Sequence, residues 1–479
     1  MRPINEFFRW SRHEVLCKAR RMTGVKFATA MRLRPNARMG AAAILVGGCV
    51  VSLALNWPGQ LSYDSVVQLH DGRTGHYNSW HPPVMAWMLG LADSLVTGTG
   101  LFIVFNTVML FVCLLSLLWV RSRVPPGVAL AAAICVSLPQ ILLYQGIVWK
   151  DVLFADAAIA GFVILAHADR WWGREILRRA LFCAAILLFA LASLARQNGA
   201  IALAFGALAV ASIAKRNGFH WRGAVACGLG AMAAALAIVL AASVALAART
   251  IGVSGPQVQI KLLQLYDLIG EVRVDPALGL DELRRVNPAL VQAIRTDGVR
   301  LYTPARNDTL TGSFRLQNEF ADTDPAAISA QWWDALLNHP ADYLRVRARV
   351  YGWVLFTPDL VQCAACYTGV NGPSQYLRDL GLKHEFRPQD RVLANYANLF
   401  VSTPAFSHAA YALLALALLV FLIRRSHPSD LAIVSLLAAA LVFALSFFVI
   451  SIACDYRYLL FLDLASLTGF FYCVATWAD

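Results

Sequence analysis

Charged side chains are scarce in this chain. Asp, Glu, Lys and Arg make up 15% of its 479 residues, whereas hydrophobic residues make up 58% and the mean hydropathy is +0.57. This shortage of charge excludes a soluble globular protein of this length. Apolar runs of about 17–25 residues recur, and a helix of that length crosses a hydrocarbon core of about 30 Å. The sequence therefore predicts an all-α polytopic membrane protein.

Several sequence signatures are also missing. There is no internal repeat, no low-complexity tract and no long Gly/Ser linker. Neither a P-loop nor a dinucleotide-binding fingerprint occurs, so a group-transfer enzyme built on this chain needs a donor other than a soluble nucleotide sugar. The first hydrophobic run leads into Trp57-Pro58 and follows a long basic region, and both features argue against a cleavable signal peptide.

Hydropathy predicts about ten transmembrane helices. The predicted spans are Gly40–Leu55, Leu101–Val120, Gly127–Tyr144, Val152–His167, Ala180–Ala195, Gly199–Ala214, Gly223–Ala248, Pro404–Ile423, Leu431–Ile452 and Leu459–Trp477. Two other apolar stretches, Pro83–Leu95 and Val350–Phe356, are too short or too interrupted to be counted. Pro83–Leu95 begins at the Pro82-Pro83 pair and is predicted to lie at the membrane interface or to dip into the membrane.

Basic residues assign the two sides of the membrane. Residues 1–38 carry ten Lys and Arg against two Glu, which predicts a cytoplasmic segment. Its aromatic residues also fit a helix lying on anionic lipid, but a plain topology anchor is the favoured interpretation. Ten spans then place every short basic connector on the cytoplasmic side. These connectors are Arg121/Arg123, the cluster from Arg170 to Arg179, Lys215/Arg216/Arg222 and Arg424/Arg425.

The topology divides the chain into four parts. Residues 1–38 form the basic segment, and 39–247 form a transmembrane module with a first outer loop at 56–82. Residues 248–404 form an outer, mainly helical segment, in which Pro340 after His339 predicts the first turn of a helix. Residues 405–479 form the last transmembrane helices. We expect both termini in the cytoplasm.

The ten cysteines lie mostly in apolar spans, where they behave as small hydrophobes. Cys363 and Cys366 are exceptions, because they fall in the outer segment. In an oxidising compartment a local disulfide and a pairing with Cys454 are both open. A zinc site there lacks two further close ligands.

The first outer loop concentrates polar and aromatic residues. It reads Trp57-Pro-Gly-Gln-Leu-Ser-Tyr-Asp-Ser65, followed by Trp80-His-Pro-Pro83. Asp64 fits a general base whose pKa is raised by partial shielding, but it fits a helix N-cap equally well. His81 fits a contact to a carboxylate or a phosphate, although a solvated interfacial histidine is favoured when it is taken alone.

Other polar clusters share this outer face. They comprise Lys150 and Asp151 with Asp156 deeper in the same span, Arg196, and Asp455, Arg457 and Tyr458 with Asp463 further along the last span. Each cation fits a phosphate-binding group, and each also fits an anchor that extends to the lipid headgroups. An acid inside an apolar run normally faces a partner or a water-filled cavity. Because a passive scaffold gives no reason for all these clusters to share one face, we expect an active site there.

The loop motifs Pro-Gly-Gln-Leu-Ser-Tyr-Asp64-Ser and Trp-His81-Pro-Pro resemble those of the polytopic GT-C glycosyltransferases. Trp149-Lys-Asp-Val-Leu-Phe-Ala, Arg196-Gln-Asn-Gly, His339-Pro-Ala-Asp-Tyr and Asp455-Tyr-Arg-Tyr are similar to segments of bacterial members. The resemblance extends over most of the chain, but each motif is short. One departure is that the first loop lacks the adjacent acidic pair of many members.

The resemblance implies a bacterial inner-membrane enzyme that transfers a sugar from a polyprenyl-phosphate carrier to an extracytoplasmic acceptor. Asp64 would be the base, and Lys150, Arg196 or Arg457 would bind the carrier phosphate. His81, Asp151, Asp156, Asp455 and Tyr458 complete the expected substrate-binding set. No nucleotide or nucleic acid is implied, and a divalent metal is compatible but not required. A ligase or polymerase using a polyprenyl-diphosphate donor and a transporter are the alternatives.

Overall fold

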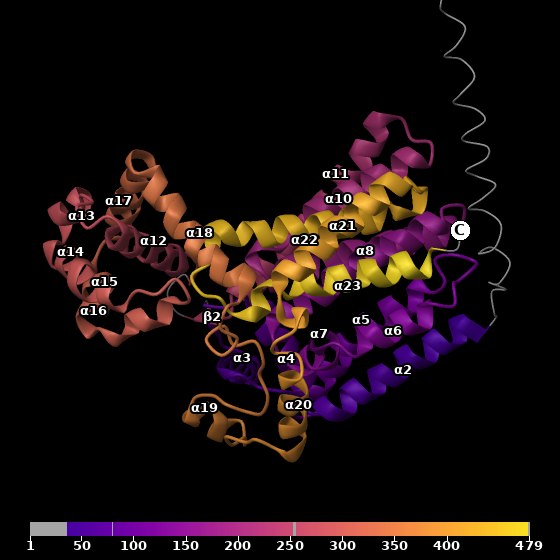
Figure 1. Ribbon diagram of the computed structural model, residues 1–479, viewed down its shortest axis with the longest axis horizontal. Coiled ribbons are helices and arrows are strands. Elements are labelled where there is room, and N and C mark those ends of the chain that lie inside the picture. The colour runs from indigo at the N-terminus through magenta and orange to yellow at the C-terminus, as the bar shows by residue number, and fades with distance from the viewer. Residues whose placement is uncertain (1–35, 79, 252–254, 478–479) are drawn as a thin grey trace, which may run out of the picture.

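The computed structural model describes residues 36–78, 80–251 and 255–477, so most of the predicted basic segment lies outside the described residues. Within this part of the chain, nine helices are long and apolar enough to cross a membrane. They are α2 (Asn36–Asn56), α5 (Gly100–Leu117), α8 (Lys150–Arg170), α9 (Glu175–Ala195), α10 (Ala200–Arg216), α11 (Trp221–Ala247), α21 (His408–Arg425), α22 (Leu431–Ile450) and α23 (Leu460–Ala475). Figure 1 shows them as one bundle, so the all-α polytopic class is confirmed.

A bent pair of helices supplies one more crossing. α6 (Val128–Val136) is followed by α7 (Pro139–Leu142) and η1 (Tyr144–Gly146), with a bend of 67°. Pro139 explains the break, because proline lacks the N–H that would continue the helix. The pair runs parallel to α2 along its whole length. Val136 packs against Gly48, and the Asn56 amide at the end of α2 donates to the carbonyl of Leu142 at 2.9 Å.

The bent pair therefore extends in one direction beside α2 and does not turn back. Counted as one span, it brings the candidate spans of the described residues to ten, and each overlaps one predicted span. α4 (Pro83–Leu95) is a shorter apolar helix of 13 residues, in agreement with its exclusion from the spans. α18 (Pro340–Phe356) begins with Pro340, as the sequence predicted, and includes the short apolar stretch Val350–Phe356.

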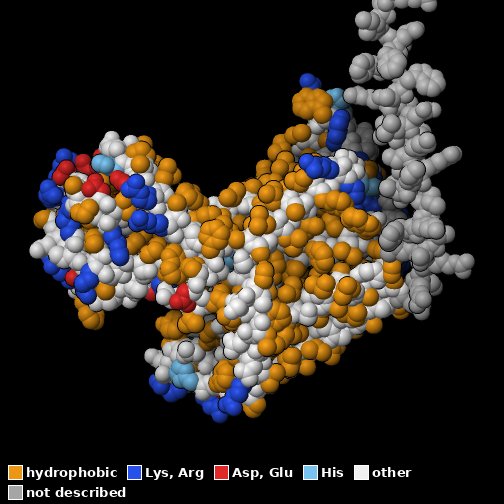
Figure 2. All heavy atoms as spheres, viewed as in Figure 1, with side chains coloured by type: hydrophobic (Ala, Val, Ile, Leu, Met, Phe, Trp, Pro, Cys, Tyr) orange, Lys and Arg blue, Asp and Glu red, His pale blue; other side chains and the backbone are white. Residues whose placement is uncertain are grey.

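One end of the bundle collects the basic connectors, and we call it the basic end. Arg38 donates to the carbonyl of Ser122 at 2.7 Å, and Arg216 pairs with Asp169. Other arginines at this end include Arg121, Arg170 and Arg425, which bond to the ends of neighbouring helices. The end of α23 lies here as well, since Arg121 donates to the carbonyl of Thr476 at 3.3 Å. Figure 2 shows hydrophobic side chains along the bundle, with charged ones gathered beyond its ends.

The sides of the membrane stay a prediction, and cysteine labelling tests it. We expect a membrane-impermeant maleimide to label Asp308→Cys in intact cells, in a chain whose exposed Cys366 is replaced by Ser. Ser122→Cys, at the basic end, should react only after permeabilisation, because basic connectors stay in the cytoplasm. The reverse pattern would invert the topology and remove the candidate site from the outer face.

Segment 248–404 contains a helical lobe and a long return to the bundle. The lobe contains α12 (Gly255–Val274), α13 (Asp281–Val286), α14 (Pro288–Ala293), η3 (Ile294–Gly298), α15 (Val299–Leu301), η4 (Asn307–Gly312), α16 (Phe314–Asp322) and α17 (Pro325–Asn338). Leu268, Ile269 and Ile328 belong to its own apolar core. α18 joins the lobe to the bundle, and α19 (Ser374–Asp379) and α20 (Pro388–Asn398) follow. β1 (Tyr77–Asn78) pairs in parallel with β2 (Thr250–Ile251).

Arg347 connects α18 to α12 of the lobe and to α22 of the bundle. Its side chain is fully buried and pairs with Asp267 of α12 at 2.8 Å. It also donates at 2.8 Å to the carbonyls of Phe448 and Ser451, at the end of α22. The guanidinium therefore connects the lobe, α18 and the bundle.

Replacing Arg347 with Met should destabilise the protein by about 3–5 kcal/mol, because Asp267 would be left buried without its partner. Thermal unfolding of the detergent-purified protein measures this loss. Arg349→Met is the matched control, since Arg349 is exposed on the same helix. Equal unfolding temperatures for the two variants would show that the buried pair does not hold the lobe.

A disulfide joins Cys363 to Cys454, which is one of the two pairings the sequence left open. Cys366 stays free. The bond attaches the segment after α18 to the residue that precedes Asp455. The backbone N–H of Tyr456 also donates to the carbonyl of Cys363 at 2.7 Å. Segment 248–404 is thus held directly against the start of α23.

Candidate active site

The first loop is fixed at its start by backbone hydrogen bonds to two distant segments. The Gln60 N–H donates to Gly146 at 2.8 Å, and the Leu61 N–H donates to Gly369 at 2.9 Å. Ser62 is then the N-cap of α3 (Tyr63–Thr74), and the Ser65 hydroxyl accepts from the Ser62 N–H at 3.2 Å. Because Ser62 and Ser65 occupy the capping positions, the carboxylate of Asp64 is left for other partners.

Asp64 is the centre of a charged cluster. Its two oxygens lie 2.8 Å from Arg457 Nη2 and 3.6 Å from His81 Nε2. Lys150 Nζ lies 3.2 Å from Nδ1 of the same histidine. As an ammonium, Lys150 can only donate, so Nδ1 accepts and the proton of a neutral His81 sits on Nε2, toward Asp64.

The raised pKa predicted for Asp64 is wrong. Burial alone would raise it, but the contacts with His81 and Arg457 outweigh burial and hold the pKa of Asp64 well below its usual range. Burial, and after it the charge of Lys150, lowers the pKa of His81 despite its contact with Asp64. At neutral pH the pair is therefore a carboxylate beside an uncharged imidazole.

The remaining cations are held by acids and aromatic rings. Arg196 pairs with Asp151, whose other oxygen lies 4.0 Å from Arg457 Nε. Arg457 also contacts Asp455 at 3.2 Å. The guanidinium of Arg196 lies 5.5 Å from the ring centroid of Tyr458, a cation–π distance. Arg196 has a side chain only 11% exposed, so it lies within the protein and does not extend freely to the headgroups.

The structure adds Arg306, which the sequence did not indicate. Arg306 Nη2 lies 2.9 Å from Asp455 Oδ1. The neighbouring backbone is anchored as well, since Asn307 donates to Ile452 and Cys454 donates to Ala305, each at 2.8 Å. No sequence signal distinguishes Arg306 from the other arginines of this polar segment. Segment 248–404 therefore contributes a cation to the cluster.

Two acids lie apart from this cluster. Asp156 is buried about 1.4 helical turns beyond Asp151 and accepts from the Gln145 amide at 3.1 Å. Asp463 is buried and lies 2.8 Å from His408 Nδ1. Of the predicted substrate-binding residues, the structure brings together all except Asp156 around Asp64.

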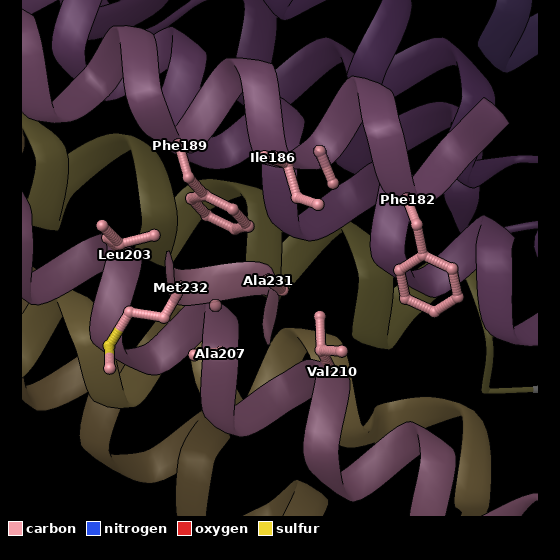
Figure 3. Close-up of a pocket in the computed structure, with 10 residues that line it drawn as sticks. Phe182, Ile186, Phe189, Leu203, Ala207, Val210, Ala231 and Met232 are labelled. Carbon is pink, nitrogen blue, oxygen red and sulfur yellow. The ribbon is translucent and has the colours of Figure 1, made fainter. Parts of the chain in front are cut away.

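A cavity elsewhere in the bundle has the wrong lining for chemistry. Figure 3 shows Phe182, Phe189, Leu203 and Met232 around it, from α9, α10 and α11. Its lining residues are all apolar or glycine. The Asp64 cluster is therefore the candidate active site.

The sequence matches no protein-family model and no curated protein. A solved structure, the archaeal oligosaccharyltransferase AglB from Archaeoglobus fulgidus in complex with an inhibitory peptide and a dolichol-phosphate, is similar over 91% of this chain and 50% of its own. The TM-score is 0.41 and the identity 14%. The Archaeoglobus fulgidus oligosaccharyltransferase in complex with Zn and sulfate is similar over 90% of this chain and 48% of its own, at TM-score 0.38 and 13% identity.

This chain thus spans about half the length of these two proteins. Similarity at this level assigns no activity to it. The function has to be inferred from the geometry of its own residues.

Proposed function

We propose that this protein is a GT-C-type membrane glycosyltransferase that moves a sugar from a polyprenyl-phosphate carrier to an extracytoplasmic glycan, lipid or protein. The observation that carries the proposal is the cluster itself. The first loop supplies Asp64, and the ends of bundle helices supply Lys150, Arg196 and Arg457 at the same point. The position at the end of the bundle suits a lipid-borne substrate whose phosphate lies at headgroup level.

The charge balance supports an anionic ligand. Among the described residues, Arg196, Arg306 and Arg457 each contact a carboxylate, whereas the polar contact of Lys150 is with His81. Lys150 thus has no carboxylate in direct contact among the described residues. A carrier phosphate would supply the missing charge, and arginine forks close by suit its oxygens.

The proposed reaction is a displacement at the anomeric carbon. The acceptor oxygen forms a bond to this carbon, while the bond to the phosphate oxygen breaks and its electron pair leaves with the carrier phosphate. Asp64 accepts the proton of the acceptor hydroxyl, and Lys150 and Arg457 stabilise the departing phosphate. Asp64 is a weak base while it is paired with Arg457. The acceptor hydroxyl therefore loses most of its proton only after positive charge has built up on the sugar.

Phosphate binding should also strengthen the base. When Arg457 also binds a phosphate, its ion pair with Asp64 weakens. The basicity of the Asp64 carboxylate then rises. The carboxylates of the cluster, Asp64, Asp151 and Asp455, each contact an arginine. Carboxylates that are paired with arginines are poor ligands for a metal ion, so side chains carry each step of the proposed reaction.

Lipid analysis tests the proposal. Deleting the protein from its host should cause a polyprenyl monophosphate carrying a single sugar to accumulate, and mass spectrometry of extracted lipids identifies it. Accumulation of a polyprenyl diphosphate carrying a longer glycan would point to a ligase or polymerase instead. A purified protein that moves lipid-linked sugar across vesicles without transfer would be a transporter.

A further inference from the structure

A second group of ionisable side chains lies in the lobe, away from the Asp64 cluster. Asp275 follows α12, His339 joins α17 to α18, and Asp342 is in the first turn of α18. One nitrogen or oxygen atom from each residue lies within 4.8 Å of those of the other two. Figure 1 shows α12, α17 and α18 together in this part of the lobe.

Glu271 supplies an independent observation beside this group. It is fully buried, and neither carboxylate oxygen has a hydrogen-bond partner. A buried carboxylate without a partner is costly, and native structures rarely retain one without a reason.

The packing of α12 against α18 leaves Glu271 on the side of α12 that leads to Asp275. The two helices are antiparallel: Asp267 pairs with Arg347, and Gly270, about one turn further along α12, packs on Val346. Glu271 lies one helical turn before Asp275, so both are on the same face of α12. That face continues toward Asp342.

The cations near the group have other partners. Arg345 lies 2.9 Å from Asp342, and Arg347 pairs with Asp267. Arg295 donates to the backbone carbonyls of Pro276 and Leu278. Among the described residues Asp275 forms no ion pair, so its carboxylate is available to a bound cation.

We propose that Asp275, His339 and Asp342 bind a divalent transition metal, with Glu271 as a buried carboxylate beside it. A mixed set of one imidazole nitrogen and carboxylate oxygens suits Zn²⁺, whereas Ca²⁺ and Mg²⁺ take oxygen ligands. The ion would fasten α12 to the turn between α17 and α18. This inference does not depend on the proposed glycosyltransferase activity.

The test is Zn²⁺ binding by the full-length protein in detergent after EDTA treatment and dialysis. We expect one Zn²⁺ per chain, measured by competition with a chromophoric chelator and by elemental analysis. His339→Ala and Asp275→Asn should each weaken binding at least about tenfold. His384→Ala is the matched control, because His384 is exposed in the same segment outside the lobe, and it should leave binding unchanged.

A second measurement covers variants that fold poorly. Saturating Zn²⁺ should raise the unfolding temperature of the wild-type chain, because a ligand that binds only the folded state stabilises it. Glu271→Gln, which keeps the shape of the side chain, should lower Zn²⁺ affinity as well. Substoichiometric binding, full affinity in His339→Ala and Asp275→Asn, or loss of binding in His384→Ala would overturn the site.

Discussion

Replacing Asp64 with Asn should lower sugar transfer by about 10²–10⁴-fold, the contribution expected of a general base. Asn keeps the shape of the side chain but cannot accept the proton of the acceptor hydroxyl. Ser62 and Ser65 provide the cap of α3, so the variant loses no capping interaction and should reach the membrane folded. Transfer is measured with purified protein, a polyprenyl-phosphate sugar and the acceptor.

Asp71→Asn is the control for this variant. Asp71 lies on the same helix but bonds to the backbone N–H of Asn78 at 3.0 Å, away from the cluster. It should retain nearly full activity. If Asp64→Asn also transfers sugar at a near-normal rate, Asp64 does not act as the base, and its role is to hold Arg457 and His81 in place.

The transmembrane architecture was predictable because its causes are local. Apolar runs set the span lengths, and Pro139 breaks one of them without adding a crossing. The basic connectors, which were used to orient the spans, do meet at one end of the bundle. The gathering of Lys150, Arg196 and Arg457 around the first loop also follows from the alternation of spans, since each lies at a helix end on the same side.

The state of Asp64 was not predictable, because its cause is distant in sequence. The sequence showed aromatic shielding, which raises the pKa of a carboxylate. It did not show the contacts with His81 and with Arg457, just before α23, that together reverse the shift. Arg306 was missed for the same reason, since only the packing of segment 248–404 against the bundle brings it to Asp455. Hydropathy and charge patterns carry no information on which side chains meet across such an interface.

Among the three cations, Lys150 gives the cleanest test of phosphate binding. Removing the charge of Arg196 or Arg457 would leave a buried carboxylate without its partner, so lower stability would accompany any loss of binding. Lys150 contacts His81 and no carboxylate among the described residues. Its replacement by Gln therefore changes the charge offered to a ligand and leaves the acidic residues paired.

Lys150→Gln should weaken binding of the polyprenyl-phosphate donor by about 10- to 150-fold, which corresponds to losing a charge-assisted hydrogen bond of roughly 1.5–3 kcal/mol. Titration of the donor against detergent-purified protein measures the change. Lys383→Gln, an exposed lysine in segment 248–404, should bind like the wild type. The Gln variants of Arg196 and Arg457 should lose a similar amount of donor affinity when the affinity is calculated for the folded fraction of each variant. Unchanged affinity in all three would reject the phosphate site, whereas a loss confined to Lys150 would restrict it to the start of α8.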